Sequence, residues 1–186
     1  FGLLVALATI IEGLLAIRTA RKAVIEKIET HLTDKATDTA EIIDGRITAF
    51  WQFLEGVARM PAMRDRSVSF SEKSRLLDIE AAFNDQIMEF NIADPQGNLW
   101  LSDGSQQDIR SLDWYQNSNQ KNYASEPFMS PVYHKLVIGF IVPVFDDNRN
   151  FIASLVVSAD GLWLSEQIKD IVVGQTGNCS IVGRTG

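Results

Sequence analysis

The sequence has few of the residues on which metal sites, disulfide bonds and nucleic-acid binding depend. It contains one cysteine, Cys179, and two histidines, His31 and His134. A single cysteine excludes an internal disulfide and a CxxC metal site, and two isolated histidines form no zinc cluster. Lysine and arginine number 17 against 24 aspartates and glutamates, which gives a net charge of −7. Nucleic-acid binding requires a basic face, so we expect no nucleic-acid partner.

Signature motifs of common enzyme classes are missing as well. The 186 residues contain no GxSxG, HExxH, P-loop or GxGxxG sequence. A haem sensor needs an axial ligand, and the two histidines, the cysteine and the four methionines show no recognisable arrangement for one. We therefore expect no catalysis and no cofactor in this chain, and any catalytic output domain would lie outside it.

The composition is that of a folded protein, and the chain opens on an apolar segment. Hydrophobic residues make up 46% and charged residues 22%, values that exclude disorder and low complexity. Residues 1–17 are apolar or small apart from Glu12, which predicts the end of a transmembrane helix. Glu12 favours a packed soluble helix instead, because a carboxylate within a membrane costs about 2.5–3.5 kcal/mol. Arg18, Arg21 and Lys22 would by themselves place the following residues in the cytoplasm.

Residues 18–60 contain no proline and carry one apolar stripe at spacings of three or four. This pattern predicts a single helix of about 60 Å, a stalk that spans modules or packs along a partner helix. We expect Pro61 to end it and Phe50, Trp51 and Phe53 to be core residues. The stripe consists of Val24, Ile28, Leu32, Ala36, Ala40, Ile43, Ile47, Trp51, Leu54 and Ala58.

Residues 61–172 predict a mixed module. A second helix is expected over 71–88, with Ser71 as its N-cap and an apolar face of Leu76, Ile79, Ala82, Phe83 and Ile87. The expected strands are 89–94, 98–102, 125–131, 134–144 and 151–160, with a short helix or turn over 109–119 and a helix over 163–172. This order predicts an α+β fold in which the long helix packs on a mainly antiparallel sheet. Residues 173–186 predict the start of a truncated second module.

The strand 151–160 alternates in character. Phe151, Ala153, Leu155, Val157 and Ala159 are expected to face the long helix. The other face carries Ile152, Ser154, Val156, Ser158 and Asp160, a mixture typical of a pocket wall. Asp160 is an N-cap of the following helix, a pocket carboxylate, or both.

The ordered motifs resemble the double Cache sensor domain of bacterial chemoreceptors, sensor histidine kinases and diguanylate cyclases. The matching segments are the membrane span, the stalk and several short motifs. The resemblance implies a PAS-like membrane-distal module that holds a small ligand, in an inner-membrane receptor with its sensor domain in the periplasm. The motifs are Asp94-Pro95-Gln96-Gly97, Asp113-Trp114-Tyr115, Ser125-Glu126-Pro127-Phe128, Ile141-Val142-Pro143-Val144, Val156 to Asp160, and Gly174-Gln175-Thr176-Gly177.

Amino-acid sensors of that family carry an arginine two residues before the Trp-Tyr pair and a tyrosine five residues before the arginine. Here Leu112 and Gln107 stand at those positions, and Arg110 is out of register. Without a bidentate guanidinium an α-carboxylate is poorly paired. Aromatic rings and carboxylates remain, which favours an amine or another cationic ligand. The residues that we expect to bind it are Asp113, Trp114, Tyr115, Phe128, Asp160, Arg110 and Ser130; in the alternative, Trp114 and Tyr115 are core aromatics and Asp113 is solvated.

The sequence therefore predicts the extracytoplasmic sensor domain of a transmembrane receptor, in the first place a methyl-accepting chemotaxis receptor. Its partners would be a small amine or amino-acid-like ligand, the membrane, and a second copy that pairs through the long helix. The alternatives are a ligand-free dimerisation stalk, or the sensor of a histidine kinase or diguanylate cyclase for a carboxylate or purine.

Overall fold

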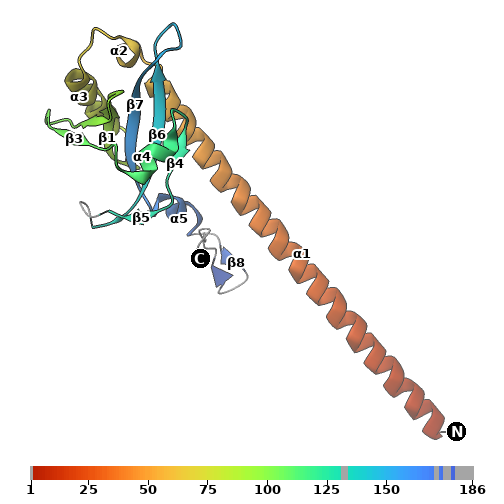
Figure 1. The fold of residues 1–186 in the computed structure, drawn as a ribbon. Helices are drawn as coiled ribbons and strands as arrows, with labels where there is room; N and C mark the ends of the chain where they lie inside the picture. Colours follow the sequence, from red (N-terminus) through yellow and green to blue (C-terminus); the bar gives the residue numbers. More distant parts are fainter. Residues whose placement is uncertain (1, 131–133, 170–171, 174–176, 179–186) are drawn as a thin grey trace.

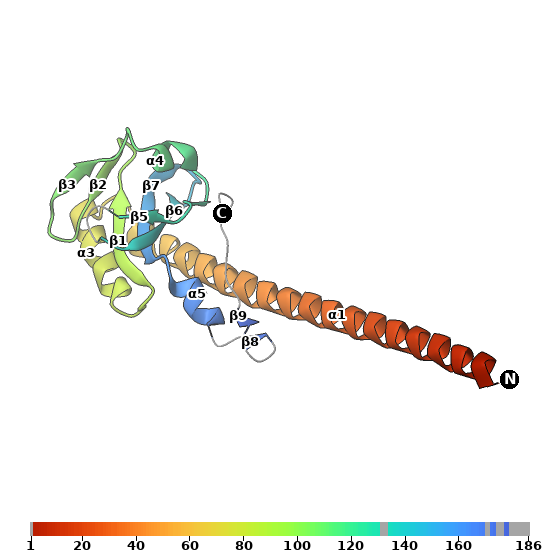
Figure 2. The same ribbon diagram turned by 90° about the horizontal axis from the view of Figure 1, so that it is seen from below.

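A long helix and a curved antiparallel sheet make up the structure, a computed structural model that describes residues 2–130, 134–169, 172–173 and 177–178. Helix α1 (Gly2–Ala58) has 57 residues, which at 1.5 Å per residue corresponds to a rod of about 85 Å. Its C-terminal turns lie against the head (residues 61–169), and the remainder projects away from it (Figures 1 and 2). The predicted α+β fold, a long helix on an antiparallel sheet, is confirmed.

Helix α1 runs without a break through the predicted boundary at residue 17. It ends at Ala58, and Pro61 begins the short helix α2 (Pro61–Arg64). Proline is tolerated at the first position of a helix because the backbone N–H there has no partner within the helix. Within the parts of the chain that the structure describes, no helix combines the length and apolarity needed to cross a membrane. The assignment of residues 1–17 to a span stays a prediction.

One sheet contains the seven strands of the head. The strand order is β3-β2-β1-β7-β6-β4, β5 also pairs with β6, and all pairings are antiparallel. At the centre, Val156 of β7 lies opposite Asn91 of β1 and Ile141 of β6. The strands are β1 (Ile87–Ala93), β2 (Asn98–Trp100), β3 (Gln106–Asp108), β4 (Tyr123–Ala124), β5 (Phe128–Met129), β6 (Leu136–Phe145) and β7 (Phe151–Asp160).

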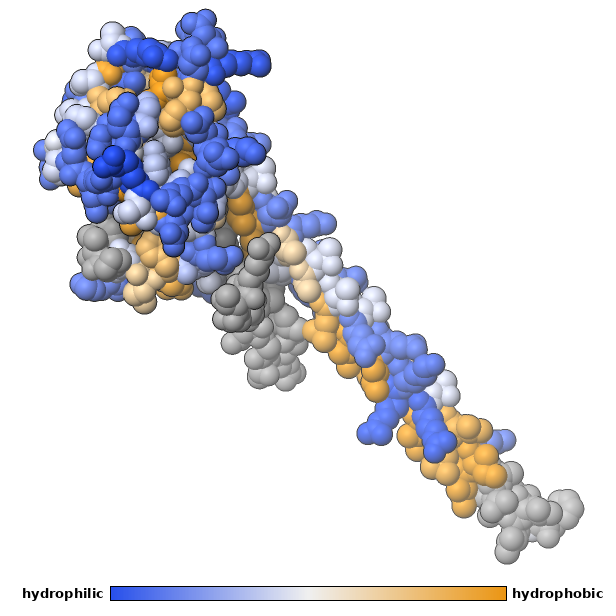
Figure 3. Space-filling model, in the orientation of Figure 1, coloured by the Kyte–Doolittle hydropathy of each residue, from blue (hydrophilic) through white to orange (hydrophobic). Residues whose placement is uncertain are grey.

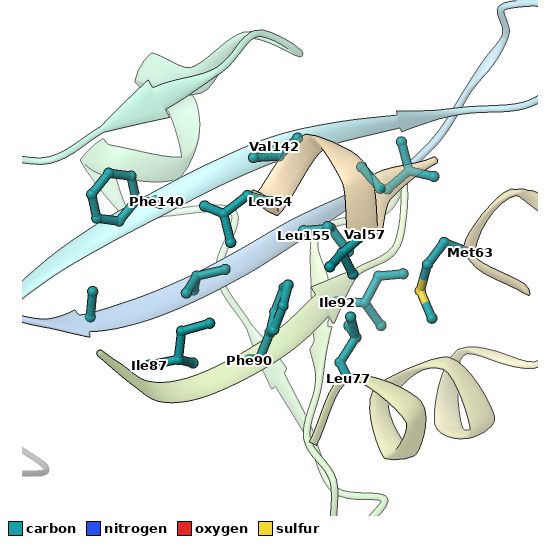
Figure 4. Close-up of a cluster of buried hydrophobic side chains, with 14 of the residues drawn as sticks. Leu54, Val57, Met63, Leu77, Ile87, Phe90, Ile92, Phe140, Val142 and Leu155 are labelled. Atoms are coloured by element: carbon teal, nitrogen blue, oxygen red, sulfur yellow. The ribbon is translucent and has the colours of Figure 1, made fainter. Parts of the chain in front are cut away.

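The main core lies between one face of this sheet and the helices. Leu54 and Val57 of α1 point onto the sheet, where they meet Phe140 and Val142 of β6 and Leu155 of β7 (Figure 4). Leu54 and Leu155 are fully buried. The predicted aromatic core cluster is confirmed, because the ring of Phe50 lies 4.9 Å from that of Phe140 and 6.4 Å from that of Phe53, while Trp51 lies 5.1 Å from Phe140.

The second helix differs from its prediction. Helix α3 covers Phe70–Ala81, and its N-cap is Ser69, whose Oγ accepts a hydrogen bond from the Glu72 backbone N at 3.2 Å. Ser69 and Glu72 have the spacing of a capping box, so the expectation that Ser71 caps the helix is wrong. The apolar face is also different. Leu77 is fully buried, whereas Phe83 lies beyond the end of the helix and is 83% exposed.

Strand β7 has the predicted bounds and, over most of its length, the predicted faces. Ala153, Leu155, Val157 and Ala159 belong to the main core. The exceptions are at the start of the strand. Ile152 joins that core although we expected it on the other face, and Phe151, expected to face the long helix, lies beside Ser154 on the other face. The register shifts between Val144 and Phe145 of the neighbouring strand, and such an irregularity breaks the two-residue alternation at its position.

The C-terminal part of the chain follows β7 closely. Helix α5 (Trp163–Ile168) is shorter than the predicted helix over 163–172. A separate pairing joins β8 (Val172–Val173) to β9 (Gly177–Asn178). The other residues of 173–186 lie outside the described part, so the second module expected there stays a prediction.

Helix α1 exposes apolar side chains over the part that projects from the head. Ile25, Ile28 and Leu32 are 50%, 52% and 43% exposed. The space-filling view shows apolar residues along this rod, interrupted by charged ones (Figure 3). An exposed apolar stripe on a helix this long is typical of a surface that another helix or module covers.

Candidate functional site

The second face of the sheet, opposite α1, carries several of the polar residues that the fold buries. Asn91 of β1 and Ser154 of β7 are 3% and 2% exposed, and both lie on the face away from the long helix by their register. Ser118 and Ser130, in the segments that cover this face, are also buried. This face therefore combines buried polar groups with a small apolar cluster, a mixture suited to a ligand site.

Helix α4 (Asp113–Ser118) brings the predicted Trp-Tyr pair onto this face. Trp114 and Tyr115 are partly buried against a small apolar cluster that includes Ile109 and Val156. Their rings meet edge to face with centroids 6.2 Å apart. Burial raises the pKa of Tyr115, and the nearby charge of Asp94 raises it further. The phenol is therefore a neutral hydrogen-bonding group at physiological pH.

Beside Tyr115 lies a hollow of about 280 Å³, which we call the Arg110 hollow. Arg110 is held by Asp108, since its Nε donates to Oδ1 at 3.0 Å and its Nη2 to Oδ2 at 2.7 Å. This paired guanidinium lowers the pKa of Asp108 to about 2. The hollow is lined by Pro95, Arg110, Tyr115, Gln116, Ser118, Asn119, Gln120, Phe151 and Ser154.

The turn at Asp94–Gly97 sets the position of Arg110. Gly97 has φ +82°, and a Cβ added there would lie 2.4 Å from Cγ of Arg110 and 3.5 Å from the ring of Tyr115. Glycine at this position is therefore required both by the backbone conformation and by the close approach of the arginine stem. The Ile109 backbone N donates to the Gly97 carbonyl at 3.0 Å, which fixes the neighbouring chain.

Asp160 lies at the other end of β7, in a hollow of about 450 Å³ that we call the Asp160 hollow. One of its carboxylate oxygens accepts a hydrogen bond from the Leu162 backbone N at 2.8 Å. The N-cap of α5 is Leu162, so Asp160 closes the preceding turn instead of capping the helix. The hollow is lined by Asp85, Gln86, Asp160, Leu162, Trp163 and Glu166.

Trp163 lines the Asp160 hollow and carries a buried donor. The residue is 5% exposed, and in the described part of the chain its indole Nε1 is the one buried side-chain nitrogen or oxygen without a hydrogen-bond partner. A buried donor left without an acceptor costs about 1–3 kcal/mol. Glu166 is paired with Lys169, which leaves Asp85 and Asp160 as the carboxylates that shape the charge of the hollow.

The seven residues predicted to bind one ligand therefore do not form one site. Arg110 and Tyr115 share a hollow with Ser154, while Asp160 lies six residues further along β7. At about 3.3 Å per residue this separation is roughly 20 Å. The ammonium and carboxylate of one α-amino acid are too close together to reach both Arg110 and Asp160.

The remaining predicted residues lie on the covering segments. Asp113 is exposed in the first turn of α4. Phe128 of β5 is 40% exposed, and its ring lies 4.0 Å from the position that a Cβ on Gly139 would take, so it covers the second face of β6. Ser130 is 5% exposed. Sequence reasoning missed Asp85, Trp163 and Glu166, because they lie just outside the strands and only the meeting of the strand ends groups them.

In the described part of the chain, no three His, Cys, Asp or Glu side chains converge as a metal-ligand set.

The comparisons with known proteins agree with this fold. The family model described as a Cache domain matches residues 16–186. The chain belongs to the Cache domain family. Cache domains are sensory, ligand-binding modules and are not catalytic. A comparison with curated proteins found no match.

Solved structures with the same fold include sensor domains of three bacteria. The ligand-binding domain of the Campylobacter jejuni chemoreceptor Tlp3 in complex with 4-methylisoleucine has a TM-score of 0.63 at 15% identity, over 78% of this chain and 63% of that one. The ligand-binding domain of the Pseudomonas aeruginosa amino acid chemoreceptor PctC in complex with GABA has a TM-score of 0.62 at 16% identity, over 76% of this chain and 65% of that one. The Escherichia coli DcuS sensor domain has a TM-score of 0.54 at 16% identity, over 69% of this chain and 98% of that one. This Cache domain spans less than two thirds of the length of the Tlp3 and PctC domains.

Proposed function

We propose that this Cache domain is the extracytoplasmic ligand-binding part of a transmembrane signalling receptor, specifically a methyl-accepting chemotaxis receptor. Its ligand is a small amine or an amino-acid-like amine. The family supports the sensory role, and the ligand-bound chemoreceptor domains of the same fold support the receptor type. In this proposal the sensor lies in the periplasm and α1 connects it to the inner membrane.

The observation that carries the ligand class is the charge of the Asp160 hollow. Asp85 and Asp160 line it without a paired arginine or lysine among the interactions of the described residues. Carboxylates at the edge of a partly buried hollow favour an ammonium group.

Signal transmission follows from where this hollow lies. It is lined by the turn after β7 and by α5, and the ring of Trp163 is 5.4 Å from that of Phe50 in α1. A ligand that binds one arrangement of this contact better than another shifts the population of the two. A small displacement of α1 would then pass along the rod, and two copies that pair through its exposed apolar stripe would transmit it together.

A thermal-shift experiment on the purified chain tests the ligand class. The probes are ethanolamine, n-butylamine, GABA and isoleucine, with ethylene glycol and n-butanol as uncharged analogues. We expect at least one amine to raise the melting temperature and the alcohols to have no effect, because only a positive charge is attracted by the hollow. If no amine raises the melting temperature, the amine assignment is wrong.

Asp160→Asn tests the site itself. Asparagine retains an oxygen for the hydrogen bond from the Leu162 backbone N but removes the charge, so we expect the variant to fold and to lose the amine response. Asp78→Asn is the matched control, because Asp78 is exposed on α3 and does not line the hollow. An amine response that persists in Asp160→Asn would place the ligand elsewhere.

A ligand-free dimerisation stalk is the second candidate function, and the exposed stripe on α1 favours it. Ile25, Ile28 and Leu32 are about half exposed, and an apolar surface of this kind usually has a partner. Light scattering after size exclusion distinguishes the two functions when it is combined with the thermal shift. A dimer that responds to no probe supports the stalk, whereas a response that Asp160→Asn abolishes supports the sensor.

A further inference from the structure

Two hairpin turns of the head have the same geometry but differ at one position. In the turn after β1, Asp94 Oδ1 accepts hydrogen bonds from the backbone N atoms two and four residues later, both at 2.9 Å. In the turn after β6, Asp146 Oδ1 accepts from the backbone N atoms at the same two positions, at 3.0 and 2.8 Å. The fourth residue of each turn has a positive φ. It is Gly97 with φ +82° in the first turn and Arg149 with φ +63° in the second.

The backbone of the second turn gives no reason for an arginine. A left-handed conformation is unfavourable for a residue with a Cβ and costs glycine nothing, and glycine occupies the matching position after β1. Local strain of this kind is found most often at functional sites. In the described part of the chain, the guanidinium of Arg149 forms no hydrogen bond or ion pair. A strained residue with an unpaired charge therefore lies in the β6–β7 turn.

Arg149 lines a hollow of about 360 Å³, which we call the Arg149 hollow. The hollow lies where the end of α1, α2 and the β6–β7 turn meet, at the end of the head farthest from the N-terminus (Figure 1). Each of these three segments supplies one arginine, since Arg59 directly follows α1 and Arg64 is the last residue of α2. Val142 and Phe145 of β6 give the hollow apolar walls.

Two carboxylates also line the hollow, and both have partners. Asp146 is paired with Arg66 at 2.9 Å and accepts the hydrogen bonds of its own turn. Glu55 accepts a hydrogen bond from Asn122 Nδ2 at 2.8 Å, and its ion pair with Arg59 is long at 3.6 Å. These carboxylates are therefore matched by other groups and do not neutralise Arg149.

Arg64 is held in place at the hollow and keeps donors to spare. Its Nε donates to the Phe145 carbonyl at 3.1 Å, and its Nη2 lies 2.6 Å from Asp147 Oδ1. Asp147 is 89% exposed and does not line the hollow. The Nη1 group of Arg64 has no partner among the described residues. The hollow thus combines the free guanidinium of Arg149 with a second one that is fixed and only partly used.

We propose that the Arg149 hollow is a binding site for a small phosphate monoester, in which Arg149 holds the phosphate and Arg64 and Arg59 contribute donors. Guanidinium groups bind phosphate oxygens in two-pronged geometry. The three terminal oxygens of a phosphate point in different directions, so they suit arginines from three segments better than a planar carboxylate does. The apolar walls favour an ester with a short apolar body. A ligand bound here would join the end of α1 to the β6–β7 hairpin.

This site does not depend on the amine site. The Arg149 hollow and the Asp160 hollow share no lining residue. Arg149 precedes β7 and Asp160 is its last residue, which separates them by roughly 30 Å along the strand. Loss of the amine response in Asp160→Asn leaves the phosphate site intact, and loss of the phosphate site leaves the amine response intact. The two proposals can therefore fail separately.

Calorimetric titration of the purified chain at neutral pH and constant ionic strength tests the ligand class. Phenyl phosphate is the probe, and inorganic phosphate, benzoate and phenol are its comparisons. We expect phenyl phosphate to bind with a lower Kd than inorganic phosphate, because only the ester reaches the apolar walls. We expect benzoate to bind about tenfold more weakly or less, and phenol not at all. No binding of phenyl phosphate, or equal binding of benzoate, would overturn the proposal.

Arg149→Gly is the decisive variant, because it separates ligand binding from stability. Glycine suits the positive φ, so we expect the melting temperature of the free chain to rise by about 2 °C, while phenyl phosphate binding weakens about tenfold or more. Arg149→Lys keeps the charge without the two-pronged geometry, so its Kd should lie between the two.

Arg75→Gln is the matched control, because Arg75 is an exposed arginine of α3 that does not line the hollow. We expect this variant to bind phenyl phosphate as the wild type does. An equal loss in Arg75→Gln would mean that the chain attracts phosphate only through its general charge. Undiminished binding in Arg149→Gly, or a melting temperature below that of the wild type, would show that Arg149 has a structural role instead. Each of these results would overturn the proposal.

Discussion

Asp94 stabilises the turn beside the Arg110 hollow, and its substitution tests how strongly that turn depends on the carboxylate. Its carboxylate is 5% exposed and accepts four hydrogen bonds. Oδ1 accepts from the backbone N atoms of Gln96 and Asn98, both at 2.9 Å. Oδ2 accepts from Asn98 Nδ2 at 2.9 Å and from Trp100 Nε1 at 3.2 Å. These bonds shape the turn that carries Gly97 and, through it, the stem of Arg110.

Asp94→Asn changes one oxygen of this carboxylate into an NH₂ group. All four partners are donors, so whichever oxygen is replaced, two donors lose their acceptor and face another donor. A hydrogen bond to a charged group contributes about 1.5–3 kcal/mol, and a donor left unpaired costs about 1–3 kcal/mol. We expect the free energy of unfolding to fall by about 2–4 kcal/mol, the lower end applying if the turn relaxes toward water.

Urea unfolding at pH 7, followed by tryptophan fluorescence, measures this change. The control is Asp103→Asn, since Asp103 is exposed and accepts one hydrogen bond, from the Ser105 backbone N at 2.8 Å; we expect it to cost less than about 1 kcal/mol. A loss in Asp94→Asn no larger than that of the control would refute the argument that the four donors depend on this carboxylate.

The effect of Asp94 should also depend on pH. Burial opposes ionisation of Asp94, but the hydrogen bonds from Asn98, Trp100 and Gln96 outweigh it and lower its pKa below the usual value of 3.8. A carboxyl with a lowered folded-state pKa stabilises the protein above its unfolded pKa, and this contribution is lost as the pH falls through the folded pKa. We expect the difference between wild type and Asp94→Asn to be constant above about pH 5 and to shrink below about pH 4. A difference that stays the same at pH 3 would contradict the assignment.

Three further substitutions test the fold around the site. Gly97→Ala should destabilise the chain by about 1–3 kcal/mol in thermal unfolding, because φ is positive and the new Cβ meets Arg110; an unchanged melting temperature would show that the stem moves aside freely. Leu54→Ala should lower the free energy of unfolding in urea by about 2–5 kcal/mol, because Leu54 is fully buried between α1 and the sheet. A loss below about 1 kcal/mol would mean that α1 is not part of the core. Ser69→Ala should lower the free energy of unfolding by about 1 kcal/mol in the same assay, because Ser69 caps α3. Ser71→Ala should leave it almost unchanged. A larger loss in Ser71→Ala than in Ser69→Ala would show that Ser71 is the cap.

Much of the fold follows from local patterns. The absence of proline before Pro61 and the three-to-four spacing of apolar residues predict a long helix, and α1 ends at Ala58. Alternation over residues 151–160 predicts a strand, and β7 has those bounds. These patterns are reliable because helix and strand periodicities are properties of the backbone itself. The short strands β3 and β4 have no such pattern and escaped prediction.

The errors arose where a choice depended on residues distant in sequence. The local sequence allows either Ser69 or Ser71 as the N-cap. Helix α3 begins at Phe70 and buries Leu77 in the core, so Ser69 is the cap. Ile152 lies in the main core because it is the extra residue of β7 at the register shift, where Val144 pairs with Ala153 and Phe145 with Phe151. Neither outcome is visible in the local sequence.

The sequence by itself determined the acidic net charge, which is a count, and the long helix, the central strands and the motifs that resemble Cache sensors, which depend on residues close together in the chain. Only the tertiary structure decided which functional groups meet. It placed Arg110 and Asp160 at opposite ends of β7 and gathered Asp85, Trp163 and Glu166 around Asp160. The physical reason is that an antiparallel sheet joins strand ends that are far apart in the chain, so a site formed at those ends depends on the pairing and not on sequence spacing.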